Sequence, residues 1–513
     1  MLVQPSATFH RVSLLWASLL AAPALAAPVA PASPPQRAID RQEALLHPLT
    51  EEGGGAPSAE GAGKTVVLTE FAPDDAWYAP VRALGEAGFD DVVSVAPWDV
   101  DAAFEALAQR APEHVVLVLA PTRLDVNFHF DFLERATRLD SDPFVDFTFG
   151  HVTGATPEAA ARFAQSAAAD PKLARDVVEF GPKVARTPLS KRRRHAWAKG
   201  FKARMWFHPE ESAGLASALA EIKPNGLLSS WGDGGPDGIA FGLTGADLAA
   251  TEKLDLSSTI LFATHPQAAV PIHWYDARLG DAKRAALDPA ASFALGLLER
   301  TPAAFFGGFE PNRGETNRHQ LERVISSGSL GDAVKTVYDD VVLAAGTPAL
   351  RLPRYEDGKK SPYGDTFDRM LGGSASRVLY GVPSWTPYPE GAPYPFEAEV
   401  QVADDAVEFV WYQGKKLERH GAVFDVLHTG GGWTHRVRLR EEVPLDVARE
   451  VKGIESVLVT RDGSELVTLA PTGAVELWCG RAYLHVTVAF PEDATFRPLW
   501  GAASYSARAR FTR

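Results

Sequence analysis

The chain has 513 residues, of which 46% are hydrophobic and 10% aromatic. This length exceeds what one hydrophobic core usually organises, so we expect two or three folded units. The net charge of −14 argues against binding of nucleic acid over the whole surface, and the single cysteine, Cys479, excludes internal disulfide bonds.

The first 26 residues have the pattern of an export signal. Arg11 is followed by an apolar run over residues 12–22, and small residues follow at Ala24 and Ala26. We expect cleavage after Ala26 and delivery to the periplasm, the cell surface or the medium. The alternative is an uncleaved N-terminal anchor, although the run is short for a membrane span and no later segment reaches that length without charges. Residues 27–63 are rich in Pro, Ala and Gly, which predicts a flexible linker.

From Lys64 onward, short β-branched runs alternate with amphipathic stretches, which predicts a parallel sheet with helices on its faces. A further helix is predicted to run to Ala167, with Thr156 as N-cap and Pro157 at its first position. The strand candidates are residues 65–69, 91–95, 114–120 and 145–149, and the other helix candidates are residues 78–87, 102–110 and 130–139.

A second α/β block follows after a basic stretch. We predict one α/β domain over residues 64–388, with sub-blocks at 64–182 and 203–388. The basic cluster from Lys191 to Arg194 lies between them, and we interpret it as an exposed connector; the alternatives are a site for an anionic polymer and a proteolytic processing site. The strand candidates of the second block are residues 203–207, 226–230, 259–263 and 303–306, and its helix candidates are 212–222, 291–299, 318–326 and 330–345.

Beyond Tyr388 the helical periodicity gives way to alternation of apolar and polar residues, which is typical of strands with one buried face. Residues 461–464 have the composition of a tight turn. We therefore predict a C-terminal β-sandwich domain over residues 389–513. Its strand candidates are residues 397–402, 406–411, 434–440, 456–460, 475–479 and 483–490.

Two loops carry the candidate functional residues. The apolar run over residues 226–228 leads directly into a loop of glycines and aspartates, where abrupt changes of direction call for the conformational freedom of glycine. The next apolar run, over residues 257–263, is followed at once by polar residues. The first loop contains Gly232, Asp233, Gly234, Asp237 and Gly238, and the second begins with Thr264, His265 and Pro266.

This arrangement resembles the gingipain-type cysteine peptidases, which have a caspase-like fold. The resemblance extends over residues 64–388 and includes residues 150–158, 291–299, 303–308 and 328–333, together with 378–383, where Val382 replaces an aspartate of the family. The family places a His-Gly pair in the first loop and its nucleophilic cysteine after the next strand. Here Asp233 replaces the histidine, and no cysteine stands at Thr264, His265 or Pro266. Thiolate chemistry of the usual form is therefore excluded at this site, and we expect no catalytic residue there.

Three functions agree with these features. The favoured prediction is an exported pseudopeptidase that binds a peptide or protein partner in the former substrate cleft. The second is an active hydrolase that uses His265 and Asp233, and the third is a structural envelope protein. The resemblance also implies that the strands ending at Ser230 and Ala263 are parallel neighbours whose loops open at one edge.

The same loops contain residues that could bind a metal or a cofactor. Carboxylate and imidazole groups suit zinc, but the spacing of the candidates matches no established ligand motif. The glycine spacing is wrong for a dinucleotide loop, and there is no Gly-x-Ser-x-Gly nucleophile motif. We therefore expect no metal and no cofactor, and the sequence leaves the oligomeric state open. The candidate metal ligands are Asp233, Asp237, His265, His273 and Asp276.

Overall fold

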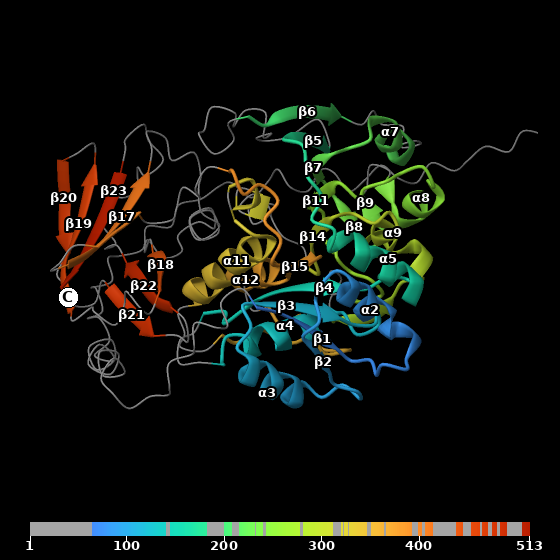
Figure 1. The fold of residues 1–513 in the computed structure, drawn as a ribbon, viewed down its shortest axis with the longest axis horizontal. Helices are drawn as coiled ribbons and strands as arrows, with labels where there is room; N and C mark the ends of the chain where they lie inside the picture. Colours follow the sequence, from blue (N-terminus) through green and yellow to red (C-terminus); the bar gives the residue numbers. More distant parts are fainter. Residues whose placement is uncertain are drawn as a thin grey trace, which may run out of the picture.

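A single ten-stranded sheet dominates the structure, a computed structural model (Figure 1). The strand order is β2-β1-β3-β4-β15-β14-β11-β7-β5-β6, and all neighbours are parallel except β14 and β15. The structure describes residues 64–391, with breaks at 140–143, 182–199, 208–214, 231, 240–242, 277–280, 311–319, 322, 327, 346–349 and 364–365, and the strands between 399 and 512. The predicted signal segment, the linker and the basic cluster lie outside these residues.

The N-terminal half of the sheet contains four parallel strands and the helices that connect them. Its strands are β1 (Thr65–Thr69), β2 (Val92–Ser94), β3 (His114–Val118) and β4 (Thr148–Val152), and its helices are α2 (Ala79–Glu86), α3 (Val100–Arg110), α4 (Val126–Arg135) and α5 (Pro157–Ala167). Thr156 caps α5 through the amide of Ala159, as predicted.

Two elements of this half begin at other residues than the sequence predicts. The strand expected at 145–149 is β4, which begins three residues later and continues through His151, because in a central strand every side chain is buried and a polar residue does not mark its end. The helix expected at 130–139 begins at Val126, because the carboxylate of Asp125 accepts the amide of Phe128 and sets the start.

The C-terminal half contains five parallel strands and ends in one antiparallel strand. Its first strand, β5, was not predicted; it lies in the first predicted sub-block, but it pairs with β6 and β7. The strands of this half are β5 (Asp176–Gly181), β6 (Lys202–Phe207), β7 (Gly226–Ser230), β11 (Thr259–Ala263), β14 (Ala304–Gly308) and β15 (Arg377–Tyr380). Its helices are α7 (Leu215–Ile222), α8 (Gly245–Ala250), α9 (Phe293–Leu298), α11 (Leu330–Ala345) and α12 (Thr366–Ala375).

The two halves repeat one strand order. In each half the second strand lies outside the first, and the third and fourth follow on the other side: β2-β1-β3-β4 and β6-β5-β7-β11. They meet where β15 pairs in parallel with β4 at Tyr380 and His151 and in antiparallel with β14. In Figure 1 the strands follow this order from β6 at the top to β2 at the bottom, with α11 and α12 to the left and α5 and α9 to the right.

Two small sheets extend from the C-terminal half. The loop after β7 folds into β8 (Gly234–Gly235), β9 (Gly238–Ile239) and β10 (Leu243–Thr244), which pair in antiparallel order. After β11 the chain forms the hairpin of β12 (His273–Asp276) and β13 (Lys283–Ala286). This hairpin reaches the N-terminal half, since Asn127 on α4 donates to the hydroxyl of Tyr275 at 3.3 Å.

The described strands between 399 and 512 form two antiparallel sheets, and six of them overlap the predicted strands. The other two, β20 (Ser464–Leu469) and β23 (Tyr505–Thr512), were not predicted. Arg461 pairs with Ser464 across the predicted turn between β19 and β20. Packing of the two sheets as a sandwich remains a prediction. One sheet contains β16 (Glu399–Val402), β17 (Ala406–Gln413), β23 (Tyr505–Thr512), β19 (Gly453–Arg461) and β20 (Ser464–Leu469), and the other contains β18 (Arg438–Pro444), β22 (Tyr483–Ala489) and β21 (Val475–Cys479).

Candidate functional site at the carboxyl edge of β7 and β11

The two candidate loops leave the sheet side by side. Strands β7 and β11 are parallel neighbours in a register that pairs Ser230 with Ala263, the last residue of each. The predicted adjacency is therefore confirmed, and both loops begin at one edge of the sheet. In open α/β sheets this carboxyl edge is where ligands bind.

The first loop turns back on itself through its glycines. Gly232 and Gly238 have φ values of +152° and +154°, which side chains rarely adopt. A Cβ atom at Gly238 would also lie 2.5 Å from the Leu243 carbonyl oxygen. Asp233 and Asp237 are exposed on this small sheet. The loop therefore presents two carboxylates to solvent and its glycine backbone to the residues beneath it.

His265 lies beneath this loop and is almost fully buried, with 2% of its surface exposed. Its ring packs edge-on against Phe293 at 4.7 Å between centroids. A Cβ atom at Gly234 would lie 3.1 Å from its Nδ1 atom. Burial lowers the pKa of His265 to about 4, and the nearby backbone of Pro266 and Gly235 raises it by a smaller amount. The imidazole is therefore neutral at pH 7.

Among the described residues, neither ring nitrogen of His265 has a side-chain hydrogen-bond partner, so no hydrogen bond joins it to Asp233. Thr264 is held by the backbone, because its hydroxyl donates to the Ser230 carbonyl oxygen at 2.7 Å and its amide donates to the same atom at 2.9 Å. Pro266 follows with no amide to donate. The structure thus brings the predicted positions to one edge without joining them as a catalytic pair.

Two buried groups at this edge were missed by the sequence analysis. Arg377, the first residue of β15, donates from Nη1 to the carbonyl of Ala263 at 3.0 Å and from Nε to Gln320 at 3.2 Å. Burial lowers the pKa of its guanidinium to about 9. This arginine fixes the backbone at the end of β11. Its position in sequence, far from β11 and next to an apolar strand, gave no signal of that contact.

The second missed group is Glu310, which follows β14 at the same edge and is 6% exposed. Its Oε2 atom accepts a hydrogen bond from the hydroxyl of Tyr355 at 3.0 Å. Burial raises the pKa of Glu310 to about 8, and the Tyr355 hydrogen bond opposes this. The available signal was a charged residue two positions after the end of a buried apolar strand. With a pKa of about 8, the carboxyl group is protonated at pH 7.

The candidate metal ligands are spread over different elements. Asp233 and Asp237 lie on the loop after β7, whereas His273 and Asp276 lie at the two ends of β12, paired with Ala286 and Lys283 on β13. In the part of the chain that the structure describes, no three His, Cys, Asp or Glu side chains are grouped to hold a metal ion. Within the same residues, no helix has the length and apolar character needed to cross a bilayer.

Several solved structures are similar to this chain. Gingipain R, an Arg-specific cysteine proteinase, aligns with a TM-score of 0.44 and 9% identity over 86% of this chain and 95% of that chain. The complex of Porphyromonas gingivalis RgpB pro- and mature domains aligns with a TM-score of 0.43 and 8% identity over 85% and 95%. The Saccharomyces cerevisiae separase–securin complex aligns with a TM-score of 0.31 and 11% identity over 53% and 16%. No protein-family model and no curated protein matches the chain. Identity at this level bears on the fold and leaves activity and substrate open.

Proposed function

We propose that this chain, whose fold resembles that of the caspase-like cysteine proteinase gingipain R, is an exported pseudopeptidase that binds a peptide or protein segment without cleaving it. The binding site in this proposal is the carboxyl edge of β7 and β11. The proposal rests on the residues that follow these two strands. They include neither a free nucleophile nor a base of suitable strength, and peptide hydrolysis needs both.

The first missing group is a nucleophile. The only cysteine of the sequence, Cys479, is the last residue of β21 in the C-terminal sheets. Thr264 is the hydroxyl residue next to His265, but its proton is donated to the Ser230 carbonyl oxygen. A nucleophilic hydroxyl must instead transfer its proton to a base during attack. Thr264 in this arrangement supports the strand end and does not supply that chemistry.

The second missing group is a base of suitable strength. A general base works best when its pKa lies near the operating pH. The pKa of His265 is about 4, and the ring is covered by the loop that contains Gly234. Asp233, at the position that the family gives to histidine, is exposed to solvent. The imidazole of His265 acts in this proposal as a packed ring that supports the loop.

The activity test uses the purified chain with a mixture of fluorogenic peptides, with and without a thiol-alkylating reagent. We expect no turnover in either condition, because no thiolate stands at the edge. Hydrolysis abolished by alkylation contradicts the proposal. Hydrolysis that resists alkylation but is lost in both His265→Ala and Asp233→Asn favours the active hydrolase; Asp233 is exposed, so its substitution leaves packing intact.

The binding test uses an array of immobilised peptides and the same chain. We expect capture of a subset of peptides and a loss of about tenfold or more in affinity for the double variant D233K/D237K, because both carboxylates lie on the loop that lines the proposed site. Asp74→Lys, at an exposed position in the N-terminal half, is the matched control and should bind normally. Equal loss in the control, or no capture at all, contradicts binding at this edge and favours a structural role.

A further inference from the structure

The N-terminal half has its own crevice, at the carboxyl ends of β1 and β3. These strands are neighbours, and the chain leaves them toward opposite sides, from β1 to β2 and from β3 to β4. The point where the strand order reverses opens a crevice at the carboxyl edge, and such crevices bind ligands in open α/β sheets. Among the described residues, this crevice holds a cavity of about 400 Å³. That volume is within the range of small-molecule sites.

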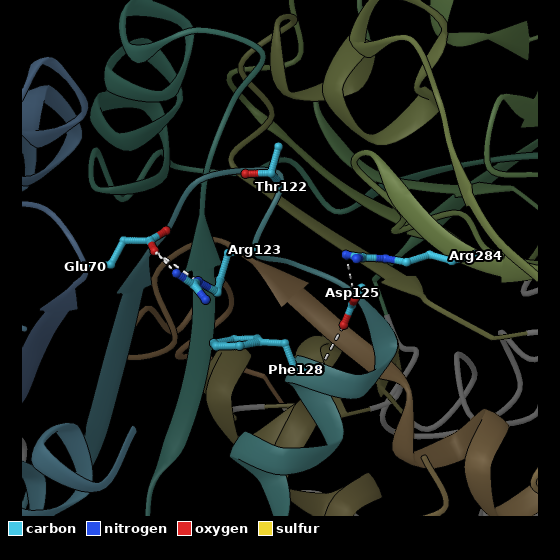
Figure 2. Close-up of a pocket in the computed structure, with 6 residues that line it drawn as sticks. All are labelled: Glu70, Thr122, Arg123, Asp125, Phe128 and Arg284. Carbon is cyan, nitrogen blue, oxygen red and sulfur yellow. Dashed lines mark hydrogen bonds and ion pairs between the residues drawn. The ribbon is translucent and has the colours of Figure 1, made fainter. Parts of the chain in front are cut away.

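Six residues from both halves line the cavity. Glu70 follows β1, Thr122 and Arg123 follow β3, and Asp125 and Phe128 belong to the start of α4. The sixth, Arg284, lies on β13, so the hairpin of the C-terminal half closes one side. Figure 2 shows Glu70 with Arg123 at one end and Asp125 with Arg284 at the other, with Phe128 between them and Thr122 opposite.

The two carboxylates are already occupied by contacts within the protein. Glu70, whose side chain is 9% exposed, accepts the amide of Ala120 at 2.8 Å and Nε and Nη2 of Arg123 at 3.0 and 2.9 Å. Asp125, whose side chain is 12% exposed, accepts the amide of Phe128 at 2.9 Å. Both acids therefore hold the local backbone and have little capacity left for a ligand.

The two arginines, in contrast, are exposed and retain donors. The side chains of Arg123 and Arg284 are 41% and 48% exposed. A guanidinium has five N–H donors, and each arginine uses only one side of its group on a carboxylate. The pair of Arg284 with Asp125 is loose, at 3.5 Å. The N-terminus of α4 adds positive potential at the same end. Each end of the cavity thus offers guanidinium N–H donors to an anionic group, although a carboxylate balances the formal charge of each arginine.

The wall between the two ends is partly apolar. Phe128 is half-buried, and its ring contacts Trp98 at 5.7 Å between centroids, which fixes its position. An aromatic face between two guanidinium groups suits a ligand with a short hydrocarbon spacer. Inorganic anions lack such a spacer and would contact one end alone.

We propose that this cavity binds a small dicarboxylic acid, with one carboxylate at Arg123, the other at Arg284 and the spacer against Phe128. The ligand could be a free diacid or the terminal acidic residue of a peptide, since both present two carboxylates. None of its lining residues is a candidate residue at the edge of β7 and β11, so the proposal does not depend on peptide binding there.

Calorimetric titration of the full purified chain with succinate, glutarate, adipate and pimelate tests the proposal. We expect one of these diacids to bind about tenfold or more tightly than hexanoate, because hexanoate provides only one charge-assisted contact. An acidic peptide with a free C-terminus and its amidated form distinguish the two ligand sources. Absence of binding by every diacid, or equal binding of hexanoate or inorganic phosphate, overturns the proposal.

Variants locate the site. Arg123→Gln and Arg284→Gln should each weaken diacid binding about tenfold. Arg162→Gln is the matched control, because Arg162 is also exposed and paired with a carboxylate, Glu299 at 2.7 Å, on another part of the surface. Arg284→Lys keeps the charge and should give a smaller loss, which separates binding from folding. Equal losses in Arg162→Gln, or unchanged binding in Arg284→Gln, rule out this cavity.

Discussion

At the carboxyl edge of the N-terminal half, two exposed arginines line an open cavity, whereas at the carboxyl edge of the C-terminal half His265 and Glu310 are buried beneath loops. The halves repeat the same strand order, so the positions are comparable. At the first edge, carboxylates pair with two arginines whose side chains face solvent. At the second edge, burial favours the neutral forms of His265 and Glu310, which lowers the pKa of His265 and raises that of Glu310.

The two halves show that the same strand order brings loops to one edge of the sheet but does not determine whether the residues there are charged or neutral. Exposure of the residues that follow the strands decides it, because the free energy of a charge depends on its access to water. The C-terminal edge is at the position where the sequence resemblance predicted a degenerate catalytic pair; there His265 and Glu310 are buried, while Asp233 and Asp237 are exposed on the loop. The N-terminal edge had no predicted role and retains charged groups in contact with solvent.

The largest expected effect is the pH dependence of Glu310. Its pKa is about 8 in the folded chain against an ordinary value of 4.5, so the folded state holds a proton that the unfolded state has lost. This contribution to stability is complete below pH 4.5 and is lost as the pH rises to 8, by roughly 4 kcal/mol. Glu310→Gln should remove the loss. Urea unfolding of variant and wild type at pH 5 and pH 8 measures this loss. If the free energy of unfolding changes equally with pH in the two proteins, Glu310 does not hold the extra proton in the folded state.

His265 should give a dependence of opposite sign. Its pKa is about 4 in the folded chain against 6.5 ordinarily, so the unfolded state binds the proton first. The contribution of the neutral imidazole to stability is complete above pH 6.5, and it falls by about 3 kcal/mol as the pH drops toward 4. In His265→Phe this loss should be absent. Because the titration of Glu310 changes stability in the opposite direction between pH 4.5 and 6.5, the quantity to compare is the difference in the free energy of unfolding in urea between variant and wild type.

A steric test probes how tightly the loop covers His265. A Cβ atom at Gly234 would lie 2.5 Å from the Gly238 carbonyl oxygen, so Gly234→Ala should destabilise the fold by about 2 kcal/mol. A Cβ atom added at Gly85 in α2 would have no other atom within 4 Å, and Gly85→Ala should stabilise the helix by up to about 1 kcal/mol. The midpoints of urea unfolding of the two variants are compared with that of the wild type. If Gly234→Ala shifts the midpoint no differently from Gly85→Ala, the loop over His265 is loosely packed.

The smallest effect concerns the charged edge. Asp125→Ala removes the cap of α4 and should cost about 1 kcal/mol. Asp125→Asn keeps a capping oxygen and loses only the charge, so its cost should be a few tenths of a kcal/mol, since the pair with exposed Arg284 is weak. Thermal unfolding of both variants resolves the two contributions. A larger cost for Asp125→Asn than for Asp125→Ala contradicts the view that this carboxylate acts mainly as a cap.

Several elements of the fold were determined by residues within a few positions of one another. The run of apolar residues at β11, the Thr156 and Pro157 start of α5, and the periodicity of α11 over Leu330–Ala345 all gave correct predictions. Strand and helix type depend on side-chain periodicity and local capping, which a sequence displays directly. The resemblance that linked the ends of β7 and β11 was likewise based on the order of such elements.

Tertiary structure decided which polar residues are buried and which meet. Glu70, Arg123 and Arg284 come together only because β1 and β3 are neighbours and the β12–β13 hairpin reaches α4. His265 is preceded by Thr264 and followed by Pro266, and nothing in that sequence shows that a glycine loop covers its ring. Burial and charge are properties of contacts between segments that are distant along the chain, and those contacts set the pKa values and the open surface on which function depends.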